Sequence, residues 1–198
     1  VMLNSPPILV VISGPSGAGK DAVLEQMRRT HEGWHFVVTA TTRPKRPGER
    51  NGVDYIFLEP LQFQALLAQD GFLEHAQVYG RYYGVLRGQV EEALQAGKDA
   101  IVKTDVQGAR TLRSKVPDTL LIFLAPPDMQ ELEHRLRDRK SETAEDLQRR
   151  IQMAQQEMDC QGEFDHVVVN HSGRLEETAT EIGRIISDEK LQRQSNAS

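Results

Sequence analysis

Runs of apolar residues alternate with amphipathic segments along most of the chain. The first run, PILVVISG (7–14), is continuous and stops at Gly14, as expected of a strand buried on both faces. After a glycine-rich loop, Val23, Leu24 and Met27 recur at helical spacing. A strand, a glycine-rich turn and a helix therefore follow one another near the start of the chain.

Three later runs have the same buried-strand character, and amphipathic helical segments separate them. A chain that alternates strands and helices in this way favours an α/β fold, with a parallel sheet flanked by helices. A last helix is expected at about 175–191. The three later strands are DAIVKTD (99–105), TLLIFLA (119–125) and HVVVN (166–170).

Two segments interrupt this rhythm. The first is rich in Gly, Pro, Arg and Tyr and contains only short strand-like pieces, whereas the second is highly charged and helical. In the second, Thr143 and Asp146 form a capping-box pattern before a helix. We therefore expect a core formed by 1–38, 87–127 and 161–198, an insertion at 39–86 and a helical flap at 128–160.

Composition narrows the class of protein. The 198 residues suit one α/β domain, and 38% hydrophobic with 27% charged residues is typical of a soluble globular protein. The net charge of −5 argues against a general polyanion binder, so no nucleic-acid partner is expected. A phosphate site would need a local cluster of Arg and Lys.

The chain also carries few signs of a secreted or membrane protein. Cys160 is the single cysteine, so no intramolecular disulfide can form, which fits a reducing compartment. The N-terminal segment has no basic region, and its apolar run is too short for a signal peptide or a membrane span. A cytoplasmic protein without membrane contact is the expectation.

The loop after the first strand matches the P-loop pattern G-x-x-x-x-G-K-[ST] through Gly14, Gly19 and Lys20. Glycines let backbone N–H groups converge on phosphate oxygens, and the helix N-terminus favours negative charge. Lys20 would reach the β- and γ-phosphates of a nucleoside triphosphate. The residues expected around the phosphates are Gly14, Pro15, Ser16, Gly17, Ala18, Gly19, Lys20, Asp21 and Ala22.

Asp21 and Ala22 stand where the pattern expects a Mg²⁺-binding hydroxyl. The carboxylate of Asp21 could hold Mg²⁺ directly or through water, because oxygen ligands suit this hard cation. It could equally be a first-turn acid that interacts favourably with the helix dipole. With a nucleotide bound, some cation must offset its charge.

A second group of residues suits a phosphate monoester. Arg43 and Arg46 lie close together in a loop shaped by Pro and Gly, with Tyr55 and Tyr83 as phenolic donors. Guanidinium groups give paired, charge-assisted hydrogen bonds to phosphate. A solvated basic loop is the alternative, although it would need neither the tyrosines nor the rigid turn residues.

From about 8 to 186 the chain resembles guanylate kinases. The segment TATTRPKRPGERNGVDYIFL (39–58) keeps that family's T-T-R-x-x-R-x-G-E-x-x-G-x-D-Y signature nearly intact. The resemblance implies a P-loop kinase fold with a GMP-binding insertion and a helical lid. It also implies the reaction MgATP + GMP → ADP + GDP, with Mg²⁺ as cofactor. Further matches are GFLEHAQVYGRYYG (71–84), DVQGA (105–109), RLRDRKSETAEDLQRRI (135–151) and VVVN (167–170).

The resemblance also implies residue roles. Glu74 would accept hydrogen bonds from the N1–H and N2 amine of guanine, supported by Thr39 and Asp105. Asn170 would lie near the adenine of ATP. The GMP phosphate would be bound by Arg43, Arg46, Tyr55 and Tyr83, the lid arginines would be Arg135, Arg139 and Arg150, and the catalytic group would be Lys20, Arg43, Arg139 and Arg150.

Three departures from the family pattern bear on mechanism. Asp21 and Ala22 remove both hydroxyls after Lys20, and Val85 replaces a Ser or Thr that contributes a guanine hydrogen bond. Lys103 replaces an Asp or Glu at a strand end near the P-loop. We hypothesise that Lys103 pairs with Asp21, offsets its charge and rebuilds the metal site; a lysine pointing to solvent is the alternative.

Two other functions remain open from the sequence. Guanylate-kinase-like domains of scaffold proteins bind phosphorylated peptides without catalysis, which Asp21, Val85 and Lys103 favour, whereas Lys20 and the lid oppose it. A kinase with an altered acceptor preference is the third possibility, since Val85 loosens the guanine site while Glu74 argues against a large shift.

Overall fold

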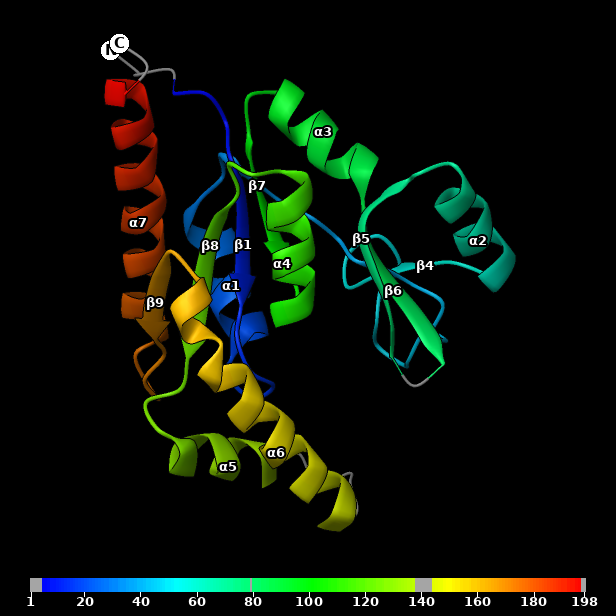
Figure 1. Cartoon of the computed structure of the whole chain (residues 1–198), viewed down its shortest axis with the longest axis vertical. Helices are drawn as coiled ribbons and strands as arrows, with labels where there is room; N and C mark the ends of the chain where they lie inside the picture. Colours follow the sequence, from blue (N-terminus) through cyan, green and yellow to red (C-terminus); the bar gives the residue numbers. More distant parts are fainter. Residues whose placement is uncertain (1–4, 79, 138–143, 197–198) are drawn as a thin grey trace.

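The computed structural model describes residues 5–78, 80–137 and 144–196. Its centre is a five-stranded sheet in the order β2-β7-β1-β8-β9, in which all pairings are parallel (Figure 1). The α/β fold predicted from the alternating runs is thus confirmed. The strands are β1 (Leu9–Ser13), β2 (Trp34–Phe36), β7 (Asp99–Lys103), β8 (Leu120–Ala125) and β9 (His166–Val169).

Helices cover both faces of this sheet. Val10 and Ile12 of β1 pack with residues of α1 and α7, whereas Leu9 and Val11 pack with residues of α3 and α4. Successive side chains of a strand point to opposite faces, so one continuous apolar run serves two cores. The helices are α1 (Lys20–Thr30), α3 (Arg87–Gln95), α4 (Val106–Lys115) and α7 (Leu175–Asn196).

The two edge strands depart from the sequence expectation. Strand β2 was not predicted, because its three residues WHF are all half-buried and form no apolar run. Strand β9 was expected to be buried on both faces, yet Val167 and Val169 are exposed and Val168 alone of the three is buried. Its place at the edge of the sheet leaves one face partly open to solvent.

The insertion contains more regular structure than its sequence suggested. It forms a second sheet in the order β4-β3-β6-β5, with a long antiparallel pairing between β5 and β6. Phe63 and Phe72 stack with ring centres 4.3 Å apart and give it a small core of its own. Its elements are β3 (Ala40–Thr41), β4 (Ile56–Phe57), α2 (Pro60–Ala68), β5 (Phe72–Val78) and β6 (Arg81–Leu86).

The charged flap consists of helices α5 (Met129–Arg137) and α6 (Ala144–Asp159), followed by a short 3₁₀ helix at Gln161–Glu163. Leu132, Leu136 and Ala154 form the small core between the two helices. The flap lies at the end of the sheet where β1 and β8 finish, and the insertion lies to the side of β7 (Figure 1). Thr143, expected in a capping box, lies outside the described residues.

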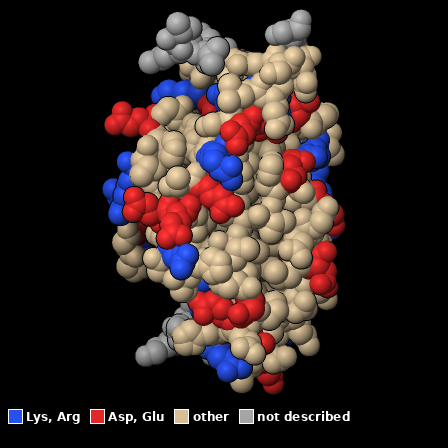
Figure 2. All heavy atoms as spheres, turned by 90° about the vertical axis from the view of Figure 1, so that its left-hand side faces the viewer, with Lys and Arg blue, Asp and Glu red and all other residues tan. Residues whose placement is uncertain are grey.

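Charges are mixed on the face formed by α7. Acidic and basic side chains are interspersed over this face, and no continuous basic patch covers its described part (Figure 2). This face therefore offers no broad surface for a polyanion, in line with the net charge of −5.

One buried ion pair ties the last helix to the sheet. The carboxylate of Asp99 is 5% exposed, accepts a hydrogen bond from the backbone N–H of Ile8 at 2.9 Å and pairs with Lys190 at 2.8 Å. Asp99, the first residue of β7, thus links this strand to Ile8 directly before β1 and to helix α7. Burial of this side chain therefore leaves neither the carboxylate nor the Ile8 N–H without a partner.

We expect Asp99→Ala to lower the free energy of unfolding by about 2–4 kcal/mol, because it leaves the Lys190 ammonium and the Ile8 N–H without their acceptor. Urea unfolding followed by circular dichroism measures this. Asp188→Ala is the matched control, since Asp188 forms an exposed pair with Arg184 at 3.8 Å. Equal stability of the two variants would contradict the assignment.

Candidate functional site

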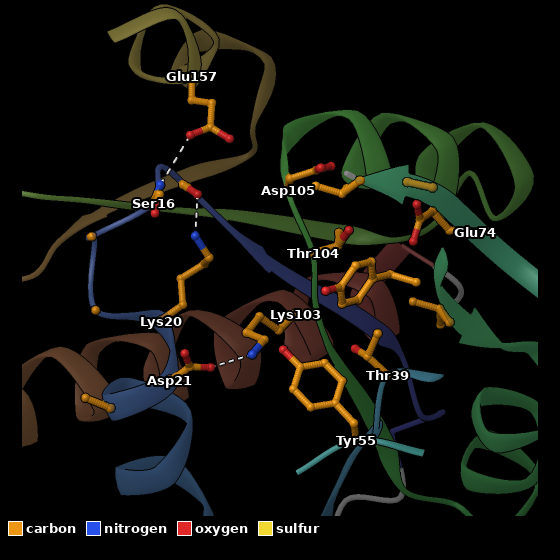
Figure 3. A pocket seen from close by; sticks show the side chains of 18 residues that line it. Ser16, Lys20, Asp21, Thr39, Tyr55, Glu74, Lys103, Thr104, Asp105 and Glu157 are labelled. Carbon is orange, nitrogen blue, oxygen red and sulfur yellow. Dashed lines mark hydrogen bonds and ion pairs between the residues drawn. The ribbon is translucent and has the colours of Figure 1, made fainter. Parts of the chain in front are cut away.

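A cavity of about 550 Å³ lies between the loop after β1 and the second sheet (Figure 3). Parallel α/β sheets commonly bind ligands at the carboxyl ends of their strands, and this cavity lies at the ends of β1 and β7. Residues from four parts of the sequence point into it. Those labelled in Figure 3 are Ser16, Lys20, Asp21, Thr39, Tyr55, Glu74, Lys103, Thr104, Asp105 and Glu157.

The glycines of the loop allow a close approach that other residues would prevent. Gly14 has φ 137°, and a Cβ there would lie 2.1 Å from the carbonyl oxygen of Leu124. Gly19 has φ 92°, and a Cβ there would lie 2.4 Å from Nδ2 of Asn170. The loop therefore packs directly on the ends of β8 and β9, and the backbone N–H groups at the start of α1 stay accessible to an anion.

Lys20, the first residue of α1, folds back over the loop. Its Nζ donates hydrogen bonds to the carbonyl oxygens of Gly14 and Pro15, the second at 3.0 Å. Burial lowers the pKa of Lys20 to about 8, although the Glu157 carboxylate opposes this shift. The ammonium is therefore poorly solvated, and an incoming phosphate would improve its environment.

Helix α6 places two side chains on Ser16 of the loop. A carboxylate oxygen of Glu157 accepts from the Ser16 backbone N–H at 3.2 Å (Figure 3), and Arg150 donates to Ser16 Oγ at 2.7 Å. Burial raises the pKa of Glu157, and the Lys20 ammonium counteracts it. The Glu157 carboxylate thus occupies a backbone N–H of the loop that could otherwise bind an anion. The sequence analysis missed Glu157, because in the sequence it is only one of several acids in the charged flap.

Arg135 and Asn170 support the loop from behind. Arg135 of α5 donates to the carbonyl oxygens of Asn170 at 3.0 Å and Ala18 at 3.4 Å, and it pairs with Glu131 at 2.9 Å. Asn170 is buried, and its Nδ2 donates to the carbonyl oxygen of Ala18 at 2.8 Å. In this structure both side chains brace the loop. Their roles toward ATP stay predictions, and Arg139 lies outside the described residues.

Asp21 and Lys103 form the ion pair that the sequence analysis hypothesised. The Lys103 ammonium at the end of β7 donates to the Asp21 carboxylate in the first turn of α1 (Figure 3). The Asp21 side chain is 79% exposed, whereas that of Lys103 is 30% exposed. Lys103 therefore lies within the cleft and does not extend into solvent. The pairing is confirmed, and the rebuilt metal site stays a prediction.

A second cavity, of about 600 Å³, holds the arginines expected to bind a phosphate monoester. Arg43 forms a bidentate pair with Glu49, at 2.7 and 3.1 Å, and its guanidinium lies over the Tyr55 ring at 5.2 Å. Hydrogen bonding to Arg43 lowers the pKa of Glu49, whose carboxylate also accepts from the Arg46 backbone N–H at 2.7 Å. Glu49, which the sequence analysis did not single out, thus occupies the guanidinium fork.

Glu74 lies in a restricted environment on the wall of the first cavity. Its side chain is 7% exposed, and burial together with the Asp105 charge raises its pKa to about 7. A Cβ at Gly108 would lie 2.0 Å from Thr104 Oγ1 and 3.1 Å from Cδ of Glu74. The glycine of DVQGA therefore leaves room for the Glu74 carboxylate.

Val85 and Asp105 complete this wall. Val85 is 1% exposed and packs in the apolar core that also contains Leu9 and Val11 of β1, so it presents an apolar side chain to the cavity. Asp105 caps α4 by accepting from the Gly108 N–H at 2.7 Å. Its carboxylate is thereby fixed near Glu74 and disfavours ionisation there.

The residues present are compatible with Mg²⁺. Among the described residues, no group of three or more His, Cys, Asp or Glu side chains could hold a metal ion. Mg²⁺ in kinases needs fewer protein ligands than this, because one or two carboxylates together with substrate phosphates and water complete its coordination shell. Asp21 supplies such a carboxylate beside the P-loop.

A helix that spans a membrane must be both long and apolar. None of the helices in the described ranges meets both requirements.

We expect Glu157→Gln to bind inorganic tripolyphosphate about fivefold to tenfold more tightly, because a negative charge leaves the neighbourhood of Lys20 while the hydrogen bond to Ser16 can remain. Isothermal titration calorimetry measures the affinity. Glu145→Gln, an exposed change on the same helix, serves as control. Unchanged or weaker binding by Glu157→Gln would show that the carboxylate does not compete with phosphate.

The Glu74 pKa predicts how stability varies with pH. A folded-state pKa raised from 4.5 to about 7 means that folding takes up a proton in this interval, so unfolding becomes easier as the pH rises from about 5 to 7. The shift corresponds to about 3 kcal/mol. Relative to the wild type, Glu74→Gln should gain about this much stability between pH 5 and pH 8 in urea unfolding. Glu92→Gln at an exposed position of α3 is the control, and parallel curves for all three proteins would refute the prediction.

Comparisons with known proteins agree with this geometry. The guanylate kinase family model matches residues 7–189. A guanylate kinase from Synechococcus sp. is 42% identical over 90% of this chain and 81% of its own length. One from Clostridium perfringens is 41% identical over 94% of this chain and 86% of its own.

A solved structure extends the agreement from sequence to fold. The crystal structure of guanylate kinase from Anaplasma phagocytophilum superposes with a TM-score of 0.75 at 31% identity, over 96% of this chain and 89% of that chain. The two proteins therefore share one fold over nearly the whole of this chain. The chain belongs to the guanylate kinase family, the ATP:GMP phosphotransferases among the P-loop nucleoside monophosphate kinases.

Proposed function

We propose that this chain transfers the γ-phosphoryl group of MgATP to GMP, giving ADP and GDP. The observation that carries the proposal is the convergence of three recognition elements on adjoining cavities: a P-loop with Lys20, the Arg43–Tyr55 cluster and the buried Glu74. These elements suit a triphosphate, a phosphate monoester and a guanine base, respectively. An in-line transfer would need the three elements along one cleft, and the two cavities that hold them share five lining residues.

The acceptor would enter between the two sheets. Arg43 and Arg46 would bind the GMP phosphate, with phenolic hydrogen bonds from Tyr55 and Tyr83, whose rings lie 6.3 Å apart. Arg43 would then exchange Glu49 for phosphate. Ionised Glu74 would accept from N1–H and the N2 amine of guanine, which adenine cannot match, while Thr39 and Asp105 support the same wall.

The donor would bind on the loop of 14–22. Backbone N–H groups and Lys20 would contact the phosphates, and the Glu157 carboxylate would leave Ser16 to make room for them. Arg135, Arg139 and Arg150 would stabilise charge on the transferring group. No strong general base is needed, because the acceptor atom is already a phosphate oxygen. Mg²⁺, bound with the help of Asp21, would neutralise charge on the donor phosphates.

The three parts of the chain would divide this work. The core of 1–38, 87–127 and 161–198 would bind the donor, the insertion of 39–86 the acceptor, and the lid of 128–160 would close over both. Closure would exclude water that otherwise hydrolyses ATP. ATP and GMP are the proposed partners. A cytoplasmic location, with no membrane or nucleic-acid partner, stays a prediction from composition.

A catalytically impaired binding module is the second candidate. Asp21, Val85 and Lys103 favour it, because each removes a group that the family uses at the site. Lys20, Glu74 and the arginine cluster oppose it, since a phosphopeptide site needs neither a P-loop lysine nor a guanine-reading acid. A kinase with an altered acceptor preference is the third candidate. It would discriminate less strongly between guanine and other bases at the part of the cavity that Val85 lines.

We expect ADP release from MgATP to depend on GMP and to be absent with AMP, CMP and UMP in a coupled assay. Lys20→Ala should abolish turnover, because the phosphates lose their buried ammonium. Glu74→Gln should lower kcat/KM for GMP at least about 10²-fold, because an amide cannot accept from both guanine donors. Urea unfolding verifies that both variants fold. A folded wild-type chain that binds GMP without turnover would overturn the kinase and leave the binding module.

A further inference from the structure

We propose that Lys103 binds phosphate oxygens at the junction of the donor and acceptor sites and stabilises the phosphoryl group as it passes between them. The inference rests on the proposed function, because it assigns a further residue to the same transfer. Lys103 is the last residue of β7 and lies opposite Ile12 of β1 in the parallel register. Strand β1 leads into the P-loop directly after Ser13, so Lys103 stands beside the donor loop.

Lys103 also faces the acceptor side. The two cavities share Asp21, Thr39, Tyr55, Tyr83 and Lys103 as lining residues. Among the lysines and arginines that the structure describes, Lys103 alone lines both cavities. A cation in this position can reach a phosphate bound on the loop and one bound at the arginine cluster, and the transferring group must pass between these two.

The side chain is fixed in this position by two contacts. Its ammonium donates to Asp21, and its Nζ lies 6.0 Å from the centre of the Tyr55 ring (Figure 3). Asp21 belongs to the donor helix and Tyr55 to the insertion, so the ammonium is positioned between the two substrate sites before either substrate binds. Such positioning lowers the entropic cost of using the charge in the transition state.

Lys103 and Lys20 act on the same space. Burial is the main cause that lowers the pKa of Lys20, and the nearby Lys103 charge lowers it further. The two ammonium groups therefore repel each other across the cavity. An anion between them removes this repulsion. The phosphates of the donor are the anions that the loop is built to receive.

The role requires no proton transfer. The P–O bond between the γ-phosphorus and the ADP oxygen breaks as a bond from a GMP phosphate oxygen forms, and Lys103 contributes only hydrogen bonds and charge. An ammonium group has three donors, so Lys103 can keep its bond to Asp21 while a second N–H turns to phosphate. Asp21 then acts as a positioning residue for Lys103.

Steady-state kinetics with MgATP and GMP provide the first test. Lys103→Met, which keeps the length and removes the charge, should lower kcat on the order of 10²-fold and change both KM values by only a few fold. Lys103→Arg should retain most of the activity. Lys98→Met, at an exposed lysine in the turn before β7, is the matched control and should equal the wild type. Urea unfolding shows whether each variant is folded.

Equilibrium binding gives a second, metal-free measurement. The probe is a bisubstrate analogue in which adenosine and guanosine are joined by a polyphosphate chain, titrated in the presence of EDTA. Lys103→Met should weaken its binding about tenfold, while the affinity for GMP alone changes by less than about twofold. The same weakening of analogue binding should be measured when Lys103→Met is added to an Asp21→Asn variant. That variant has no Asp21 carboxylate, so repulsion between an unpaired Asp21 and the phosphates cannot cause the weakening.

The outcomes separate the two levels of the proposal. A wild-type chain without GMP-dependent turnover refutes the proposed function itself. An active wild type with an equally active Lys103→Met refutes this inference alone. Full recovery of analogue binding in the Asp21→Asn, Lys103→Met double variant would also refute it, because Lys103 would then serve only to neutralise Asp21.

Discussion

The cleft depends on internal carboxylates that keep its cations close together in the absence of phosphate. Several positive side chains face one small volume, and their mutual repulsion would otherwise spread them apart or lower their pKa values. Each of three cations that line the two cavities has a carboxylate near it: Glu157 for Lys20, Asp21 for Lys103 and Glu49 for Arg43. Arg135, behind the loop, is paired in the same way with Glu131.

Under the proposed function, substrate binding would be an exchange of anions. A phosphate would replace a carboxylate at Ser16 and at Arg43, so part of the interaction energy would be spent on separating existing pairs. Groups that are already paired also lose little freedom when the substrate arrives. Burial and the Asp105 charge raise the pKa of Glu74 to about 7, and the Lys115 charge opposes this shift, so an ionised Glu74 is unfavourable at the wall proposed to bind guanine.

Sequence patterns predicted what depends on local chemistry. The continuous run that became β1 and the glycines of the P-loop follow from residue type and spacing, whereas the Asp21–Lys103 pair was inferred from two departures from the guanylate kinase pattern. The missed features depend on the tertiary structure: β2 has no apolar run of its own, and the inserted sheet is defined by pairing between β5 and β6. Glu157 is one acid on a charged helix until the fold sets it against Ser16.

The paired change at Asp21 and Lys103 alters the charge of the cleft as well as its contacts. A hydroxyl on the P-loop helix with an acid at the strand end, which is the family pattern, carries one negative charge. An acid on the helix with a lysine at the strand end carries none, so this cleft is one unit more positive. That difference favours anionic substrates in a partly dry site. Under the proposed function it would offset the loss of the P-loop hydroxyls, and it would shift part of the phosphate contact from the loop to the neighbouring strand.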